Sequence, residues 1–208
     1  MIALIDYGAG NLTSVRKGFA AAGAALFTPA IPDELRTASA IVVPGVGHFS
    51  ATAALSGPWY DAIAEAVANG MPLFGICLGM QWLFEGSEEA PDVSGLGVIP
   101  GMCTRLRGGV DGGARAKVPH VGWNILRQQA RSQLPVATGT HVYFTHSYAA
   151  PVGAHAVATC AYGVDEFAAV VEKGHVFGVQ FHPEKSSDAG VRILKQFVSI
   201  VRERAHAL

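Results

Sequence analysis

Apolar positions recur with two different periods along the first half of the chain, and these periods predict strands and helices in turn. Leu12, Val15 and Phe19 recur at helical spacing behind a capping Asn11, and a second helical stripe ends at Val67. Four short runs are wholly apolar and are expected to be strands: residues 2–5, 25–27, 41–43 and 73–76. Short buried strands separated by helices are typical of a parallel sheet that is covered on both faces.

The pattern changes after about Gly95, where β-rich runs follow one another closely. The expected strands are residues 141–144, 156–160, 167–171 and 176–181. Glu172, Lys173 and Gly174 are typical of a hairpin loop, so antiparallel pairing is expected there. The last segment has the spacing of an amphipathic helix. We therefore predict one α/β domain over residues 1–208, with a central, mostly parallel sheet, helices on both faces and antiparallel strands in the second half.

Charge is scarce and balanced in this chain. Lys and Arg number 15 against 16 Asp and Glu, and charged residues make up 15% of the 208, where about 25% is typical. The lack of a basic excess argues against a nucleic-acid binder, and the high apolar content excludes a disordered chain. The cysteines, Cys77, Cys103 and Cys160, form no paired motif, so neither a disulfide framework nor a zinc site is expected.

One charge-free stretch, residues 66–84, has about the length of a membrane-spanning helix. Asn69, Gly70, Pro72 and Gln81 interrupt it, so a continuous apolar helix is a poor interpretation. The start of the chain lacks the basic segment of a signal peptide. We expect a soluble, cytoplasmic protein.

The same stretch contains the most informative motif, Gly75-Ile76-Cys77-Leu78-Gly79, where a strand meets a helix. Glycines two residues before and after a nucleophile are typical of a nucleophile elbow, here with Cys in place of Ser. The glycines have a steric role, because a Cβ at either position would clash in so sharp a turn. The amide of Leu78 is placed to donate to a developing oxyanion. The alternative is a small buried cysteine in an ordinary turn.

An acid–base pair is predicted where the run 176–181 ends. His182 and Glu184 stand at i and i+2, which in an extended chain places them on the same side. A cysteine nucleophile needs a base, and that base needs an acceptor to orient it. Alone, the pair is weak evidence and a solvated strand end is the favoured interpretation, so its value comes from the elbow found in the same chain.

A glycine-rich loop, Pro44-Gly45-Val46-Gly47-His48, follows the strand at 41–43. It lies at the edge where α/β proteins bind ligands, and one of its amides would complement that of Leu78. A simple turn is the alternative. The loop at residues 6–11 has glycines in a dinucleotide-like pattern, but Thr13 replaces the third glycine, so no such cofactor is expected.

Together these segments resemble the class I, or triad, glutamine amidotransferases, and within them the glutaminase subunits that serve histidine biosynthesis. The elbow and His182-Pro183-Glu184 are shared by the wider family. The narrower likeness is carried by residues 119–124, Thr145-His146-Ser147-Tyr148 and Lys185-Ser186, and Val121 stands where Met is more usual. The likeness covers essentially the whole chain and implies the flavodoxin-like fold of this family.

The resemblance implies roles for individual residues. Cys77 would be the nucleophile, His182 the acid and base, and Glu184 the residue that orients it. The oxyanion hole would use Leu78 with Val46 or Gly47. The expected glutamine-binding residues are Gly45, Gln81, Ser147 and Tyr148. The expected partner-facing residues are Trp123, Asn124, Tyr143 and Lys185.

The resemblance also implies a reaction and a partner. Glutamine would be hydrolysed to glutamate and ammonia without a cofactor or metal. The ammonia would pass to a (β/α)8 cyclase subunit in a heterodimer that makes imidazole glycerol phosphate and an aminoimidazole carboxamide ribotide. Two alternatives stay open: a glutaminase of this fold that serves another acceptor enzyme, and a catalytically silent binding subunit. A cysteine hydrolase that acts on esters or peptides is disfavoured by Gln81 and by His146-Ser147-Tyr148, which resemble an amino-acid clamp.

Overall fold

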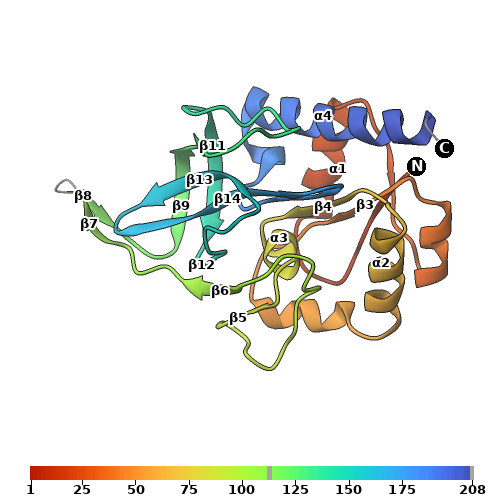
Figure 1. Cartoon of the computed structure of the whole chain (residues 1–208), viewed down its shortest axis with the longest axis horizontal. Helices are drawn as coiled ribbons and strands as arrows, with labels where there is room; N and C mark the ends of the chain where they lie inside the picture. The colour runs from red at the N-terminus through yellow and green to blue at the C-terminus, as the bar shows by residue number, and fades with distance from the viewer. Residues whose placement is uncertain (112–113, 207–208) are drawn as a thin grey trace.

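An eight-stranded sheet forms the middle layer of the molecule, in a computed structural model that describes residues 1–111 and 114–206 (Figure 1). Its strand order is β10-β13-β14-β15-β4-β3-β1-β2. The first-half strands are β1 (Ile2–Leu4), β2 (Leu26–Phe27), β3 (Ala40–Val43) and β4 (Leu73–Ile76). The others are β10 (Arg127–Gln128), β13 (Ala156–Tyr162), β14 (Asp165–Lys173) and β15 (Val176–Val179). β2, β1, β3, β4 and β15 pair in parallel, and β14, β13 and β10 extend the sheet antiparallel, which confirms the predicted fold class.

Helices cover both faces of this sheet. Helices α1 (Leu12–Ala21) and α4 (Ser187–His206) lie on one face, and α2 (Pro58–Ala68) and α3 (Leu78–Trp82) lie on the other (Figure 1). Asn11 caps α1 as predicted, since its side chain accepts a hydrogen bond from the Ser14 amide at 3.0 Å. Three 3₁₀ turns complete the helical elements: η1 (Pro32–Thr37), η2 (Phe49–Leu55) and η3 (Pro183–Lys185).

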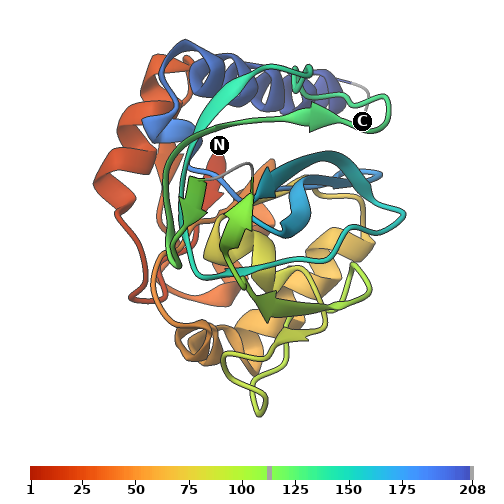
Figure 2. The same cartoon turned by 90° about the vertical axis from the view of Figure 1, so that its left-hand side faces the viewer.

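Smaller sheets lie beside the main one. β9 (His120–Ile125) pairs antiparallel with β11 (His141–His146), and the two run side by side in Figure 2. β12 (Tyr148–Ala149) pairs with β6 (Met102–Arg105), which also pairs with β5 (Gly86–Ser87). β7 (Gly109–Asp111) pairs with β8 (Ala114–Ala116). The strand β9 was not predicted from the sequence, and its exposed residues alternate with residues that are buried or half-buried.

The predicted hairpin loop at Glu172, Lys173 and Gly174 is wrong in its position. Glu172 and Lys173 belong to β14, where they pair with Phe177 and Val176 of β15. The turn is confined to Gly174 and His175, and Gly174 has the positive φ of +62° that so tight a connection requires. The antiparallel pairing itself is as predicted.

The chain leaves the sheet earlier than predicted, at Val179 rather than at Phe181. It then turns toward β11, where the His182 amide donates to the Tyr143 carbonyl at 2.9 Å. Because β4 and β15 are parallel neighbours with Ile76 opposite Val179, the segments that follow them emerge at the same edge of the sheet. This register brings two segments that are far apart in sequence into one region.

The charge-free stretch at 66–84 is interrupted in the structure as the sequence indicated. It contains the end of α2, all of β4 and α3. Within the described ranges, no helix is long and apolar enough to cross a membrane.

Two helices approach the turn η3 closely because each presents a glycine to it. A Cβ on Gly18 of α1 would lie 3.0 Å from the Cβ of Glu184. A Cβ on Gly190 of α4 would overlap the carbonyl oxygen of Pro183. The sheet edge and both helices therefore hold η3 between them.

We expect Gly190→Ala to lower the free energy of unfolding by about 1–3 kcal/mol, because the added methyl meets backbone that has no room to move. Helix propensity alone would predict the opposite sign, since Ala favours a helix over Gly. The matched control is Gly153→Ala, whose new Cβ has nothing within 4 Å. Urea unfolding of the three proteins measures the difference, and equal stability of both variants would contradict the close approach.

Candidate functional site

The turn between β4 and α3 presents Cys77 at the carboxyl edge of the sheet. Cys77 has φ 53° and ψ −105°, which is the left-handed region that side chains rarely adopt. A Cβ on Gly75 would lie 2.6 Å from the Gly79 carbonyl oxygen, and a Cβ on Gly79 would overlap the Val43 carbonyl oxygen. The steric role predicted for the two glycines is confirmed.

His182 and Glu184 are in contact and buried. His182 Nδ1 lies 2.8 Å from Glu184 Oε1, and each side chain is 3% exposed. The pair meets for a different reason from the one predicted. Glu184 lies in the 3₁₀ turn η3, so the tight turn after His182, rather than an extended strand, folds the carboxylate back onto the ring.

The structure places His182 near Cys77 as well as near Glu184. Burial alone would lower the pKa of His182, but the nearby Cys77 and the carboxylate of Glu184 raise it to about 9. Among the described residues, His182 Nε2 has no hydrogen-bond partner of ordinary geometry, so the Cys77 thiol lies near this nitrogen without a full hydrogen bond to it. His182 Nε2 is therefore available to exchange a proton with the Cys77 thiol.

Ser186 fastens the backbone of His182 to β11. Its hydroxyl donates to the His182 carbonyl at 2.6 Å and accepts from the Tyr143 amide at 2.9 Å. Ser186 is fully buried. Its motif was singled out from the sequence, but this contact was not predicted, because it joins segments 43 residues apart.

The glycine-rich loop closes over Leu78 in this structure. The Leu78 amide, which was predicted to serve the oxyanion, donates instead to the Gly45 carbonyl at 3.3 Å. Tyr7 holds the start of the loop, because its hydroxyl donates a hydrogen bond to the Pro44 carbonyl at 2.7 Å. Gly47 has φ +116°, and the neighbouring Val46 is exposed. In this state the Leu78 amide is engaged by the loop and does not face an oxyanion.

A cavity of about 280 Å³ opens beside Cys77. Three of the expected glutamine-binding residues, Gln81, Ser147 and Tyr148, line this cavity; the fourth, Gly45, is not among its lining residues, and Gly47 of the same loop is. Glu89 also lines it, and its carboxylate accepts from the Phe49 amide at 2.8 Å. Sequence reasoning missed Glu89, because it is one of several acidic residues after α3, with Glu85, Glu88 and Asp92, and nothing in the sequence distinguishes it from the others.

Two buried amide side chains, Gln81 and Gln180, lie next to the cavity and the thiol. Gln81 Nε2 donates to the Tyr148 carbonyl at 2.8 Å and to Gln180 Oε1 at 3.1 Å. Gln180 Nε2 lies 3.5 Å from Cys77 Sγ. Gln180 was not predicted as a site residue, although it follows β15 directly.

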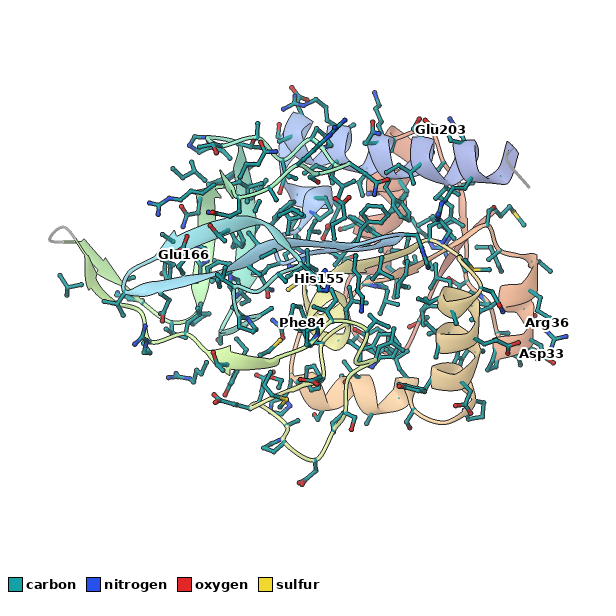
Figure 3. The ribbon with its side chains drawn as sticks, viewed as in Figure 1. Asp33, Arg36, Phe84, His155, Glu166 and Glu203 are labelled. Carbon is teal, nitrogen blue, oxygen red and sulfur yellow. The ribbon has the colours of Figure 1, made fainter. Side chains whose placement is uncertain are left out.

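A larger cavity, of about 580 Å³, lies at the opposite edge of the sheet. Its lining includes Met71 and Pro72, which precede β4, and Asp33 and Arg36 of η1, which are labelled in Figure 3. The described residues that line it include no cysteine or histidine. The volume of a cavity therefore does not identify the reactive site here; the side chains that line it do.

The expected partner-facing residues do not all share one face. Trp123 is 53% exposed and meets Tyr143 edge to face, with 6.0 Å between ring centroids, and Lys185 is exposed. Asn124 alternates to the inner side of β9, where its amide donates to the Ala161 carbonyl at 3.0 Å. The outer side of β9 is apolar: Val121, Trp123 and Ile125 are its exposed residues.

The other two cysteines belong to the core. Cys77, Cys103 and Cys160 are free thiols, and all three are buried. Burial raises the pKa of Cys103 and raises that of Cys160 to about 12, so both stay protonated at neutral pH. In the part of the chain that the structure describes, no group of three or more His, Cys, Asp or Glu side chains is placed to hold a metal ion.

A cysteine at a strand-to-helix turn, with a histidine–carboxylate pair from the neighbouring parallel strand, is the arrangement of a cysteine-dependent α/β hydrolase. The model of the family "Glutamine amidotransferase class-I" matches residues 3–201. The chain belongs to this family.

Named relatives are similar over nearly the full length. The chain is 48% identical over 215 residues to the imidazole glycerol phosphate synthase subunit HisH of Natronomonas pharaonis, covering 98% of this chain and 96% of that one. It is 44% identical to the subunit of the same name from Bacillus subtilis, covering 98% of each.

Solved structures share the fold. A crystal structure of a glutamine amidotransferase matches with a TM-score of 0.75 and 18% identity, over 97% of this chain and all of that one. The structure of PurLQS from Thermotoga maritima matches with a TM-score of 0.73 and 17% identity, over 96% of this chain and 98% of that one. At these identities the likeness concerns the fold alone.

The raised pKa of His182 gives a prediction for Glu184→Gln. Loss of the carboxylate charge is expected to lower the pKa of His182 from about 9, because the imidazolium loses its ion-pair partner. The folded state keeps this proton where the unfolded chain, with an ordinary pKa of about 6.5, loses it. In the wild-type protein, this proton on His182 therefore stabilises the folded state. The stabilisation is fully present below pH 6.5 and is lost as the pH rises through about 9.

An NMR titration of the imidazole resonances measures this pKa directly. Glu203→Gln is the matched control, because Glu203 is exposed on α4, where Figure 3 shows it far along the helix. An unchanged His182 midpoint in Glu184→Gln would show that the carboxylate does not hold the proton.

Proposed function

We propose that this chain is the glutaminase subunit of an imidazole glycerol phosphate synthase. It hydrolyses glutamine and passes ammonia to a (β/α)8 cyclase subunit. The observation that carries the proposal is the meeting of Cys77 with the His182–Glu184 pair beside a cavity, in a chain 48% identical to a named subunit of that synthase. The proposal treats residues 1–208 as one domain that works in the cytoplasm, without a cofactor.

The reaction follows from the positions of the side chains. His182 takes the thiol proton, and the sulfur of Cys77 attacks the side-chain carbonyl carbon of glutamine. The carbon–nitrogen bond then breaks, ammonia leaves with a proton from His182, and a γ-glutamyl thioester remains on Cys77. Water, deprotonated by His182, attacks the thioester and releases glutamate. Glu184 holds the ring and stabilises its charged form throughout.

The closed loop sets a condition for this reaction. The tetrahedral intermediate carries an oxyanion that needs two amide donors, and the Leu78 amide is occupied by the Gly45 carbonyl. Rotation of the peptides that follow Gly45 would free Leu78, and the amide of Val46 or of Gly47 would turn toward the oxyanion according to which peptide rotates. We propose that binding of the cyclase favours this rotated state, so the isolated chain hydrolyses glutamine slowly.

The cavity suits the amino-acid end of glutamine. Gln81, Ser147 and Tyr148 offer polar groups along one wall, and the carboxylate of Glu89 complements an α-ammonium group. Gly45 lets the loop lie against Leu78, because a Cβ at this position would come within 2.9 Å of the Leu78 Cβ. The site thus combines a place for the charged end of the substrate with a nucleophile at its amide end.

The apolar outer side of β9 suits a protein partner. Val121, Trp123 and Ile125 form an exposed hydrophobic stripe, with Tyr143 behind Trp123 and Lys185 nearby in the same proposed face. On the cyclase the ammonia would be joined to a phosphoribulosyl compound, which gives imidazole glycerol phosphate and an aminoimidazole carboxamide ribotide. Neither nucleic acid nor a membrane takes part.

We expect Cys77→Ala to abolish glutamine-dependent synthesis by the two-subunit complex while ammonia-dependent synthesis continues. The loss should be about a thousandfold or more, because the covalent route is removed and only the partner's reaction remains. Cys160→Ala is the matched control, since Cys160 is buried in β13 away from the cavity.

Synthesis assays with glutamine and with ammonium salts separate the outcomes. Loss of both activities in Cys77→Ala would mean that Cys77 is structural. Co-purification of the wild-type chain with an acceptor enzyme other than a barrel cyclase would overturn the assignment to this synthase.

A further inference from the structure

Two buried histidines, His120 and His146, take no direct part in the proposed reaction. They face each other across β9 and β11, with His120 Nδ1 3.1 Å from His146 Nε2. His120 is stacked between Tyr162 and Phe144, with ring centroids 3.9 and 4.7 Å away. The aromatic neighbours therefore fix the place of this ring.

Both rings are neutral at neutral pH. Burial lowers the pKa of His120 to about 4. Burial also lowers the pKa of His146 to about 3, against the effect of its hydrogen bond to the Tyr148 carbonyl and together with the charges of His120 and His182. A neutral imidazole has one donor and one acceptor nitrogen, so its partners determine which nitrogen carries the proton.

The partners of the two rings determine a single direction of donation. His146 Nδ1 lies 2.9 Å from the Tyr148 carbonyl, which only accepts, so this nitrogen carries the proton. His146 Nε2 then accepts from His120 Nδ1. His120 Nε2 is left as an acceptor, and the amide nitrogen of Asn124 lies 3.4 Å from it. Every bond donates from Asn124 toward Tyr148.

The Tyr148 carbonyl joins this chain of hydrogen bonds to the glutamine cavity. It also accepts from Gln81 Nε2 at 2.8 Å, and the same nitrogen bonds Gln180, whose amide lies 3.5 Å from the Cys77 sulfur. Gln81, His146 and Tyr148 all line the cavity. One carbonyl therefore connects the histidine pair to the cavity wall.

We propose that His120 and His146 are positioning residues for glutamine hydrolysis. Their relay holds the Tyr148 carbonyl, and through it Gln81, in the place that the substrate requires, and ties both to β9. The inference rests on the proposed function. Asn124, at the donor end, adjoins the exposed Trp123, so a partner that shifts β9 moves the start of the relay.

Two substitutions of His146 separate its two nitrogens. The amide nitrogen of Asn takes about the place of Nδ1, so His146→Asn keeps the donor to the Tyr148 carbonyl. The amide of Gln reaches the place of Nε2, so His146→Gln keeps a group facing His120 and loses that donor. Both variants remove one aromatic ring from the same buried position, and thermal unfolding of both measures the structural cost.

We expect His146→Gln to raise the KM for glutamine about tenfold in the two-subunit complex, the size expected for one lost hydrogen bond. His146→Asn should raise the KM for glutamine by a several-fold smaller factor than His146→Gln does, while the two variants have similar melting temperatures. Equal KM and kcat in the two variants would overturn the inference while the proposed function stands. Absence of glutamine hydrolysis by the wild-type complex would overturn the proposed function and this inference together.

The tautomers provide a readout that does not depend on activity. Nitrogen-15 NMR of the histidine-labelled full-length chain at pH 7 should show both rings neutral with the proton on Nδ1. A charged ring, or a proton on His146 Nε2, would overturn the relay whether or not the chain hydrolyses glutamine.

Discussion

The close crossing of Gly79 over the Val43 carbonyl is the constraint on which the site depends. It lets α3 start directly at the end of β4, and this forces Cys77 into a left-handed backbone conformation. Such strain persists only where the surrounding structure determines it, and here two buried parallel strands do so. The register of β4 with β15 then brings His182 to the same edge. The packing of the backbone thus places Cys77 and His182 at the same edge of the sheet.

The polar groups around this turn form two separate supports. Glu184 and Ser186 fix the ring and the backbone of His182, whereas Gln81 and Gln180 connect the thiol to the cavity wall. Both supports reach the β9–β11 pair, the first through Tyr143 and the second through His146. Buried polar groups are costly unless they are bonded, so these networks tie the site to that pair firmly. A subunit that docks on β9 would act on both.

The parts of the fold predicted from sequence are those determined by local pattern. The buried strands, the Asn11 cap and the elbow each depend on neighbouring residues, and the structure has them as expected. The hairpin turn was misplaced because Glu172 and Lys173 are polar residues at strand ends, which a turn signal cannot separate. The contacts of His120 and Gln180 depend on pairing between distant segments, for which a single sequence contains no local signal.

The most direct test of the account is the site of covalent modification by a glutamine analogue that carries an electrophile at the amide position. Mass spectrometry of peptides from the two-subunit complex would locate the adduct. The account predicts one adduct on Cys77, none on the buried Cys103 or Cys160, and loss of glutamine hydrolysis in proportion to labelling. Inactivation that follows labelling of another residue, or full hydrolysis after complete labelling of Cys77, would contradict it.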